Sequence, residues 1–340
     1  MSKIDEKFIL EIKRQIDELM AWKKSFTHTI NTLSKKIDDI MWHFEIDDIA
    51  YWEKIRITGP PPSDFSLKFI RNRGGIYTPR IEPNDEIIIY AYIIYPKNIR
   101  EDKKYPLIVF VHGGIHGNFG TQYASIIRDL IKQGYIIVAP EYRGSSGYGE
   151  IFYHLIDYGG LEVNDVHAAK QWMLKNCRQI DPKRIGIMGY SHGGFITLLS
   201  ISRYPKDYIV AYAGVPVSDL LYRLAYRWKL PIEEMAKEYG GKTPKEDIEE
   251  YKRRSPVWNV DKIETPLLIH AATNDRDVSI IEIENLIAHL KAANKDFEYK
   301  IYVNPPGGHT FWRMNTQIGA QARLETYRFL AKYLKPENPP

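Results

Sequence analysis

The stretch GIMGYSHGGF, from Gly186 to Phe195, places one serine among four glycines, between an apolar run typical of a strand and an apolar run typical of a helix. Its centre, GYSHG, matches the pattern G-x-S-x-G with Ser191 in the middle. A strand can turn this sharply into a helix only where small neighbours leave room, and the turn holds the serine hydroxyl out at the carboxyl edge of the sheet. The stretch therefore predicts a nucleophilic Ser191 on a strand–turn–helix element.

On both sides of this stretch, short apolar segments alternate with amphipathic ones. Segments typical of strands include YPLIVFVHGG, YIIVAPEYRG, IVAYAGVPVSD, TPLLIHAATND and FEYKIYVNPPGGH, and segments typical of helices include TQYASIIRDLIKQG, LEVNDVHAAKQWMLKN and SIIEIENLIAHLKAAN. Continuous apolar strands that alternate with helices predict an α/β protein with a mostly parallel, doubly wound sheet. Charged helical sequence at 220–263 interrupts the alternation, and we expect this insertion to roof the site.

A serine hydroxyl is a weak nucleophile until a base removes its proton, and the base is a histidine that a carboxylate holds in the correct tautomer. In this architecture the order along the chain is serine, acid, histidine, each on a loop after a strand. His309 follows the last predicted strand, behind two glycines. The preceding strand ends near both Asp275 and Asp277, and spacing alone leaves these two open as the acid.

Two backbone N–H groups are expected to stabilise the oxyanion of the tetrahedral intermediate. One belongs to His192, the residue after the nucleophile, and the other to the glycine pair Gly113 and Gly114 in VFVHGG. Four aromatic residues flank the catalytic positions, and they either line an acyl pocket or belong to the core: Tyr190, Phe195, Phe311 and Trp312.

Six motifs occur in an order that resembles the catalytic domain of the prolyl-oligopeptidase family within the α/β-hydrolases. They are FVHGG, PEYRGSSGYGE, GGLEVNDVHAAKQWM, GYSHGGF, SPVWNVDKIETPLLIHAATND and GGH, and the resemblance runs from about Asp85 to Tyr333. It implies the α/β-hydrolase fold, and it implies Asp275 as the acid, because the family's aspartate stands three residues before a valine, here Val278. It also aligns the second oxyanion donor with Gly114.

Peptidases of that family usually carry a β-propeller before the catalytic domain, whereas only the helical segment 1–57 precedes the proline-rich linker TGPPPSD here. We therefore expect a carboxylesterase without the propeller, such as a feruloyl or aryl esterase, with a small-molecule ester as substrate. The alternative is an aminopeptidase or acylaminoacyl peptidase of the same family.

The chain divides into a helical extension at 1–57 and a catalytic domain at 64–336 that contains the insertion. Apolar residues of the extension recur in steps of three and four, which is heptad spacing. They are Ile9, Ile12, Ile16, Leu19, Phe26, Ile30, Leu33, Ile37, Ile40 and Phe44. Because a single helix of this length exceeds what a compact domain can cover, we expect a break near Ser25–Thr27. The two resulting helices are expected to act as a cap over the site or as a contact in a homo-oligomer.

Several classes of protein are disfavoured by composition. The 47 basic and 43 acidic residues nearly balance, which argues against nucleic acid as a partner. The sequence shows neither an apolar run of membrane-spanning length nor an N-terminal secretion signal, so we expect no membrane association and a cytoplasmic location. Neither a metal nor an organic cofactor is implied, since His112 and His116 lack further ligands nearby.

Overall fold

A computed structural model describes residues 3–340 except 65, 68–81, 83, 227–231 and 237–238. The described residues form one eight-stranded sheet in the order β1-β2-β4-β3-β5-β6-β7-β8. Strands β3 to β8 are parallel to one another, whereas β2 pairs antiparallel with β1 and β4. The strands are β1 (Ala50–Gly59), β2 (Ile87–Pro96), β3 (Tyr105–Val111), β4 (Ile136–Glu141), β5 (Ile180–Tyr190), β6 (Val210–Gly214), β7 (Leu267–Ala272) and β8 (Phe297–Tyr302). The predicted mostly parallel α/β fold is confirmed.

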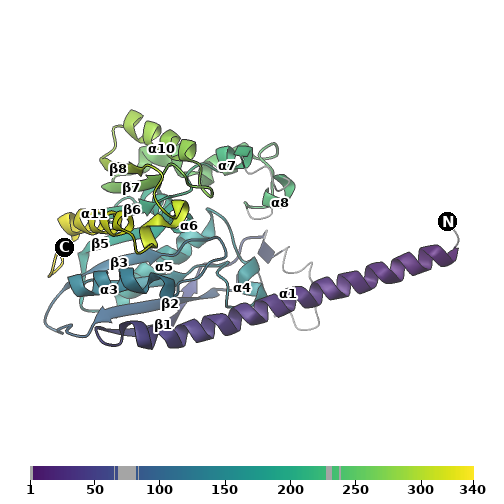
Figure 1. Ribbon diagram of the computed structural model, residues 1–340, viewed down its shortest axis with the longest axis horizontal. Coiled ribbons are helices and arrows are strands. Elements are labelled where there is room, and N and C mark those ends of the chain that lie inside the picture. Colours follow the sequence, from purple (N-terminus) through teal and green to yellow (C-terminus); the bar gives the residue numbers. More distant parts are fainter. Residues whose placement is uncertain (1–2, 65, 68–81, 83, 227–231, 237–238) are drawn as a thin grey trace.

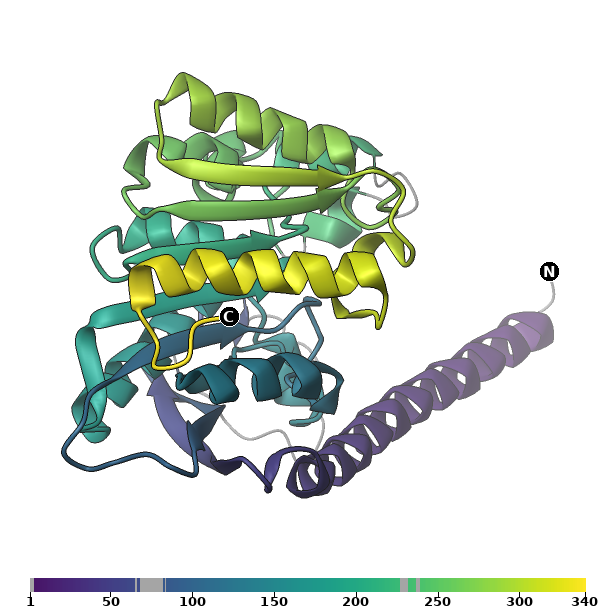
Figure 2. The same ribbon diagram turned by 60° about the vertical axis from the view of Figure 1, so that its left-hand side comes forward.

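Helices cover both faces of the sheet, as Figure 2 shows. Strand residues alternate between the two cores: Leu107 and Val109 of β3 enter one, while Ile108 and Phe110 enter the other. The first core is closed by α5 (Leu161–Asn176), α6 (His192–Arg203) and α10 (Ile280–Ala292). The second is closed by α3 (Ala124–Gln133) and α11 (Gln317–Leu334). Burial on both faces explains why the strand sequences are continuously apolar.

The insertion between β6 and β7 is helical, as predicted. Its described elements are α7 (Leu220–Tyr226), α8 (Ile232–Ala236), α9 (Ile248–Arg254) and the 3-10 helix η2 (Pro256–Lys262). Shorter elements elsewhere are α4 (Glu150–His154) and the 3-10 helices η1 (Thr121–Tyr123) and η3 (Gly308–Arg313). Within the described part of the chain, no helix combines the length and the apolar character that a membrane span requires.

The N-terminal segment forms one continuous helix, α1 (Lys3–Ile46), and the predicted break near Ser25–Thr27 is wrong. The Thr27 hydroxyl donates to the carbonyl of Lys23, and the Thr29 hydroxyl donates to the carbonyl of Ser25. Hydroxyls that bond to the preceding turn satisfy themselves inside a helix, so these polar residues do not end it. Figure 1 shows α1 extending well beyond the rest of the molecule.

The C-terminal part of α1 is fastened to the body by polar contacts around one aromatic stack. Lys35 is buried and donates to Asp39 at 2.7 Å and to the carbonyl of Phe119 at 2.8 Å. The Trp42 ring stacks on Phe119 with 5.1 Å between ring centroids. Asp38 accepts hydrogen bonds from the backbone and the hydroxyl of Thr121. The helix is therefore held to the body through its C-terminal half, from about Lys24 onward.

The predicted domain limit at residue 57 falls inside β1, so the expectation of a wholly helical extension needs correction. Residues 50–59 pair along their full length with β2 and form the first strand of the eight-stranded sheet. Directly after β1 in the sequence, the carbonyls of Pro60 and Pro61 accept hydrogen bonds from the guanidinium of Arg143. These bonds fix the start of the proline-rich linker. Arg143 also forms a fully buried ion pair with Asp165, at 2.7 Å.

Candidate active site

Ser191 lies between the last residue of β5 and the first residue of α6. Its φ is 58° and its ψ is −120°, a conformation that non-glycine residues rarely adopt. The two glycines of the motif are needed because a side chain at either position would collide with the backbone. A Cβ on Gly189 would lie 2.3 Å from the carbonyl oxygen of Gly193, and a Cβ on Gly193 would lie 2.1 Å from that of Val111. The strained turn holds the Ser191 side chain out at the carboxyl end of the parallel strands.

The structure brings Ser191, His309 and Asp275 into one hydrogen-bonded chain. His309 Nε2 lies 2.8 Å from Ser191 Oγ, and His309 Nδ1 lies 2.7 Å from Asp275 Oδ2. Because an ionised carboxylate only accepts, Nδ1 carries the proton, and Nε2 is left free to accept the proton of the serine hydroxyl. This is the arrangement that a base-activated serine nucleophile requires.

Hydrogen bonds within the loop after β7 distinguish Asp275, which bonds to His309, from Asp277. The second oxygen of Asp275 accepts the backbone N–H groups of Asp277 at 2.8 Å and Val278 at 2.9 Å. These bonds fix the carboxylate, whose side chain is only 3% exposed, with its other oxygen toward His309. The Asp277 side chain is exposed, and it lines the cavity described below.

The predicted oxyanion donors line the same cavity as Ser191. Gly114 has a φ of 77°, and its carbonyl accepts the hydroxyl of Tyr142 at 2.7 Å, which fixes the orientation of the glycine loop. The N–H of the neighbouring Gly113 is engaged by the hydroxyl of Tyr123 at 3.1 Å. The N–H of His192 lies in the first turn of α6, where the helix offers no acceptor. Gly114 and His192 therefore remain the predicted pair of donors, with Gly113 as a neighbour.

The imidazole of His192 is itself held in place by a neighbouring carboxylate. It is buried, and its Nε2 lies 3.1 Å from the buried carboxylate of Glu162. The other oxygen of Glu162 accepts the N–H of Gly159 at 2.8 Å. This contact ties the start of α6 to the start of α5 and thereby supports the backbone that carries Ser191.

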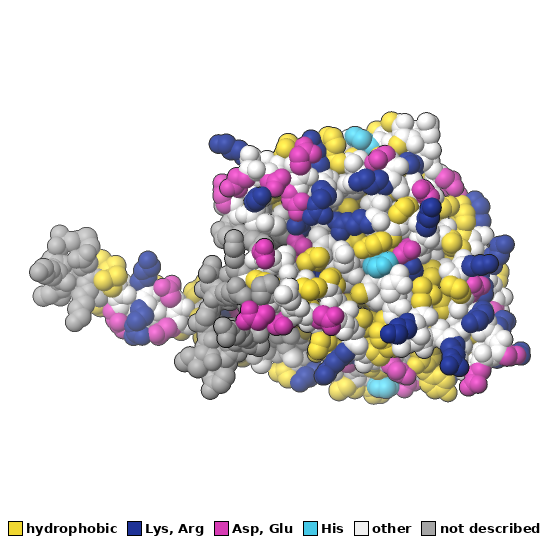
Figure 3. All heavy atoms as spheres, turned by 180° about the vertical axis from the view of Figure 1, so that it is seen from behind, with side chains coloured by type: hydrophobic (Ala, Val, Ile, Leu, Met, Phe, Trp, Pro, Cys, Tyr) yellow, Lys and Arg dark blue, Asp and Glu magenta, His cyan; other side chains and the backbone are white. Residues whose placement is uncertain are grey.

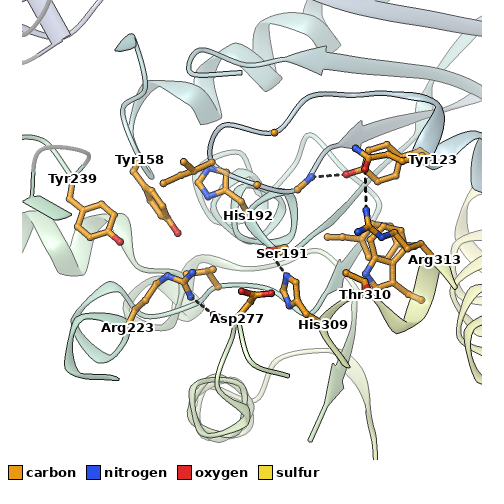
Figure 4. Close-up of a pocket in the computed structure, with 18 residues that line it drawn as sticks. Tyr123, Tyr158, Ser191, His192, Arg223, Tyr239, Asp277, His309, Thr310 and Arg313 are labelled. Atoms are coloured by element: carbon orange, nitrogen blue, oxygen red, sulfur yellow. Dashed lines mark hydrogen bonds between the residues drawn. The ribbon is translucent and has the colours of Figure 1, made fainter. Parts of the chain in front are cut away.

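A cavity of about 630 Å³ opens beside Ser191, and Figure 4 shows the side chains around it. Of the four predicted pocket aromatics, Tyr190 and Trp312 line it and stack on each other. Phe195 and Phe311 do not, because both are fully buried in the two cores. For these two residues the interpretation as core holds.

Ten residues that line the cavity were not predicted from the sequence: Ile115, Gly117, Gln122, Tyr123, Tyr158, Val217, Arg223, Tyr239, Thr310 and Arg313. Two of them, Arg223 and Tyr239, come from the insertion at 220–263, as its expected role as a roof requires. None of the cavity's lining residues comes from α1, so the expectation that the N-terminal region caps the site is not met by the described residues. The signal for Arg223 was a basic residue in the apolar helical stretch LLYRLAY.

Arg223 brings a positive charge to the cavity wall. Its guanidinium donates to the carbonyl of Asp277 at 3.1 Å and to the hydroxyl of Tyr226 at 3.0 Å. Burial by itself would lower the pKa of Arg223, but the nearby Tyr158 and Tyr226 hydroxyls and the Glu282 carboxylate outweigh it and raise that pKa. The guanidinium thus stays charged next to the catalytic residues.

Two groups of side chains in the described residues come close enough to share a metal ion. One consists of Asp275, Asp277 and His309, and it overlaps the triad, in which Asp275 and His309 are already bonded. The other consists of His28 on α1 with Glu150 and His154 on α4, and none of these lines the cavity. The chemistry of the site needs neither group to hold a metal.

Comparisons with known proteins agree with this geometry. A sequence profile described as the prolyl oligopeptidase family matches residues 119–337. A curated relative, the uncharacterized peptidase YuxL of Bacillus subtilis, is 31% identical over 67% of this chain and 34% of its own length. The acylamino-acid-releasing enzyme of Mus musculus is 26% identical over 82% of this chain and 36% of its own length. The chain thus spans about a third of the length of these relatives.

Among solved structures, the uncomplexed acylaminoacyl peptidase of Pyrococcus horikoshii superimposes with a TM-score of 0.66. It covers 84% of this chain, the chain covers 42% of it, and the two are 23% identical. This likeness independently supports the fold.

Proposed function

This chain is a serine hydrolase of the prolyl oligopeptidase family, and from that premise we propose that it releases N-acylated amino acids from short peptides. The observation that carries the proposal is a guanidinium group in the cavity wall. Arg223 lines the cavity with Arg313 and the carboxylate of Asp277, and it is ion-paired at 3.9 Å with the buried Glu282. A free α-ammonium group offers a guanidinium no acceptor, whereas a blocked, uncharged terminus offers Arg223 a carbonyl oxygen to hydrogen-bond.

The reaction follows from the hydrogen-bonded chain. Ser191 Oγ attacks the carbonyl carbon while its proton passes to His309 Nε2, and the N–H groups of Gly114 and His192 receive the oxyanion. The imidazolium, stabilised by Asp275, then gives this proton to the leaving amine, and an acyl-enzyme remains. Water, deprotonated by His309, attacks the acyl-enzyme, and Ser191 regains its proton as the acid departs.

The names of the relatives support amide rather than ester substrates. The mouse protein and the Pyrococcus horikoshii structure are both named for the release or cleavage of acylated amino acids. A carboxylesterase, the function expected from the sequence, stays as a second candidate because Tyr158, Tyr239 and Trp312 give the cavity an aromatic wall suited to aryl esters. The acyl-enzyme chemistry is the same, and an ester leaving group needs less assistance than an amine.

The test compares three substrates at one pH: N-acetyl-leucine p-nitroanilide, leucine p-nitroanilide and p-nitrophenyl butyrate. We expect kcat/KM for the acetylated anilide to exceed that for the free one at least tenfold, with the ester also cleaved. Preference for the free anilide would indicate an aminopeptidase, and cleavage of the ester alone would indicate a carboxylesterase. Ser191→Ala controls for background hydrolysis, since losing the nucleophile costs several powers of ten.

A matched pair of variants tests the role of the cavity wall. Arg223→Met should raise KM for the acetylated anilide at least fivefold and leave the ester nearly unchanged. Arg313→Met removes the same charge on the opposite side of Ser191, as Figure 4 shows, and controls for a general electrostatic effect. Equal effects of both variants on all three substrates would contradict a specific contact from Arg223.

A further inference from the structure

Helix α1 has two faces of opposite character. The face that meets the body carries His28, Lys35 and Trp42, which recur every seven residues; Lys35 and Trp42 are buried, and His28 is half-buried. The apolar residues in heptad spacing lie on a different face. Among the side chains that the structure describes, this apolar face is left uncovered from Ile9 to Phe44.

We call the apolar face the seam. Its members are 40% to 78% exposed: Ile9, Ile12, Ile16, Leu19, Phe26, Ile30, Leu33, Ile37, Ile40 and Phe44. Figure 3 shows hydrophobic side chains beside charged ones on the part of α1 that stands clear of the body. A repeat of 3.5 residues, sustained over five heptads, is the spacing that keeps one face in contact with a second helix through a left-handed supercoil. A helix that merely lies on a globular domain has no need of it.

We propose that the seam pairs with the seam of a second copy of this chain, as an antiparallel two-helix coiled coil. If each of the nine apolar seam residues from Ile9 to Ile40 buries roughly 100 Å², the two helices together bury about 1,800 Å², within the range of specific, stable interfaces. The seam therefore supplies enough surface for a dimer without a contribution from the catalytic body.

The antiparallel orientation follows from Lys23, which takes the one seam position that is not apolar. In a parallel pair, Lys23 would face the partner's Lys23, and two like charges would meet at the interface. An antiparallel pair centred between Lys24 and Ser25, the midpoint of α1, puts Lys23 against the partner's Phe26 instead. There the aliphatic stem packs on the ring, and the ammonium group can reach its face or the solvent.

The same register matches the other seam positions without exception from Ile9 to Ile40. It sets Ile9 against the partner's Ile40, Ile16 against the partner's Leu33, and Leu19 against the partner's Ile30. The two-fold symmetry supplies the reciprocal contacts. Since each body is attached near the C-terminal end of its α1, the two bodies lie at opposite ends of the pair.

The first test is a pair of leucine substitutions in the full-length protein. Leu19 lies on the seam and is 65% exposed, and Leu10 lies off the seam and is 63% exposed. In a monomer the two would respond alike. We expect wild type and Leu10→Glu to sediment as dimers, and Leu19→Glu to weaken the dimer at least 100-fold with its hydrolase activity per chain retained. A monomeric wild type, or a dimer unaffected by Leu19→Glu, would overturn the proposal.

The second test fixes the orientation through cysteine cross-linking after Cys177, the one native cysteine, is replaced by serine. Chains with Ile16→Cys alone and chains with Leu33→Cys alone are oxidised separately and as a mixture. The antiparallel register predicts a disulfide-linked dimer only in the mixture. Dimers formed by either variant alone would show a parallel pair, and a monomer that sediments with lipid vesicles would identify a membrane surface as the occupant instead.

Discussion

Replacement of Asp275 by asparagine should nearly abolish turnover while leaving the fold intact. One oxygen of Asp275 accepts two backbone N–H groups, from Asp277 and Val278, and the other accepts His309 Nδ1–H at 2.7 Å. An asparagine must keep its carbonyl oxygen toward the two N–H groups, because its NH₂ group cannot accept hydrogen bonds from them. Its NH₂ group is therefore turned toward His309.

This reversal forces the wrong tautomer on the catalytic base. A donor facing Nδ1 makes that nitrogen an acceptor, so the ring proton moves to Nε2, which can then no longer take the proton of Ser191. We expect kcat to fall about 10³- to 10⁴-fold, equivalent to roughly 4–5.5 kcal/mol of activation free energy. The loss should appear in kcat rather than KM, since Asp275 does not line the cavity.

The assay is steady-state hydrolysis of p-nitrophenyl butyrate, with thermal unfolding as the check on folding. Asp277→Asn is the matched control, and it should change kcat less than threefold because only the backbone of Asp277 bonds to Arg223 and Asp275. A large loss with Asp277→Asn and a small one with Asp275→Asn would refute the assignment. A collapse of the melting temperature in Asp275→Asn would show that the side chain acts mainly on the loop.

Three further outcomes are expected. Ser191→Ala should lower kcat at least 10³-fold with an unchanged melting temperature, which single-turnover kinetics and calorimetry would show. Arg143→Met should lower the unfolding free energy by about 3–5 kcal/mol in urea titrations, because it leaves the buried Asp165 carboxyl without its ion-pair partner, and Arg143→Met combined with Asp165→Leu should cost less. Burial lowers the pKa of His270 to about 4, although Glu325 opposes the shift. Between this pH and about 6.5, the pKa of a free histidine, the unfolded chain therefore binds more protons than the folded chain. Stability should consequently fall as the pH drops through this window, and His270→Gln should reduce the loss between pH 7 and 4.5 by about 2 kcal/mol in denaturant titrations.

The nucleophile and its base were predictable because their signals are local. Ser191 is marked by glycines that the turn needs within four residues, and His309 by its place after the last strand. The order of the strands then brings their carboxyl ends together. Spacing did not separate Asp275 from Asp277, since what distinguishes the two is a pair of backbone hydrogen bonds within one loop. Here the resemblance to the family supplied what the spacing could not.

The cavity wall was not predictable in the same way. Phe195 lies four residues after Ser191, but one turn of α6 directs it into the core rather than toward the substrate. The residues that do form the wall, such as Tyr158 and Tyr239, come from segments distant in sequence and lie in stretches without a periodic pattern. Proximity in sequence to a catalytic residue therefore says little about which side chains meet the substrate.

The error about α1 has a physical cause that bears on the proposed dimer. The prediction of a break rested on length alone, because a straight helix of that length exceeds what a compact domain can cover. The structure instead buries the face that carries Lys35 and Trp42, because the ammonium group of Lys35 finds acceptors on Asp38, Asp39 and the Phe119 carbonyl and so loses little on leaving water. Hydrophobicity alone would have selected the other face. Since the face with Lys35 and Trp42 already holds the helix to the body, the seam has no role within one chain that would account for its heptad spacing. Pairing with a second chain in register accounts for both the spacing and the single lysine.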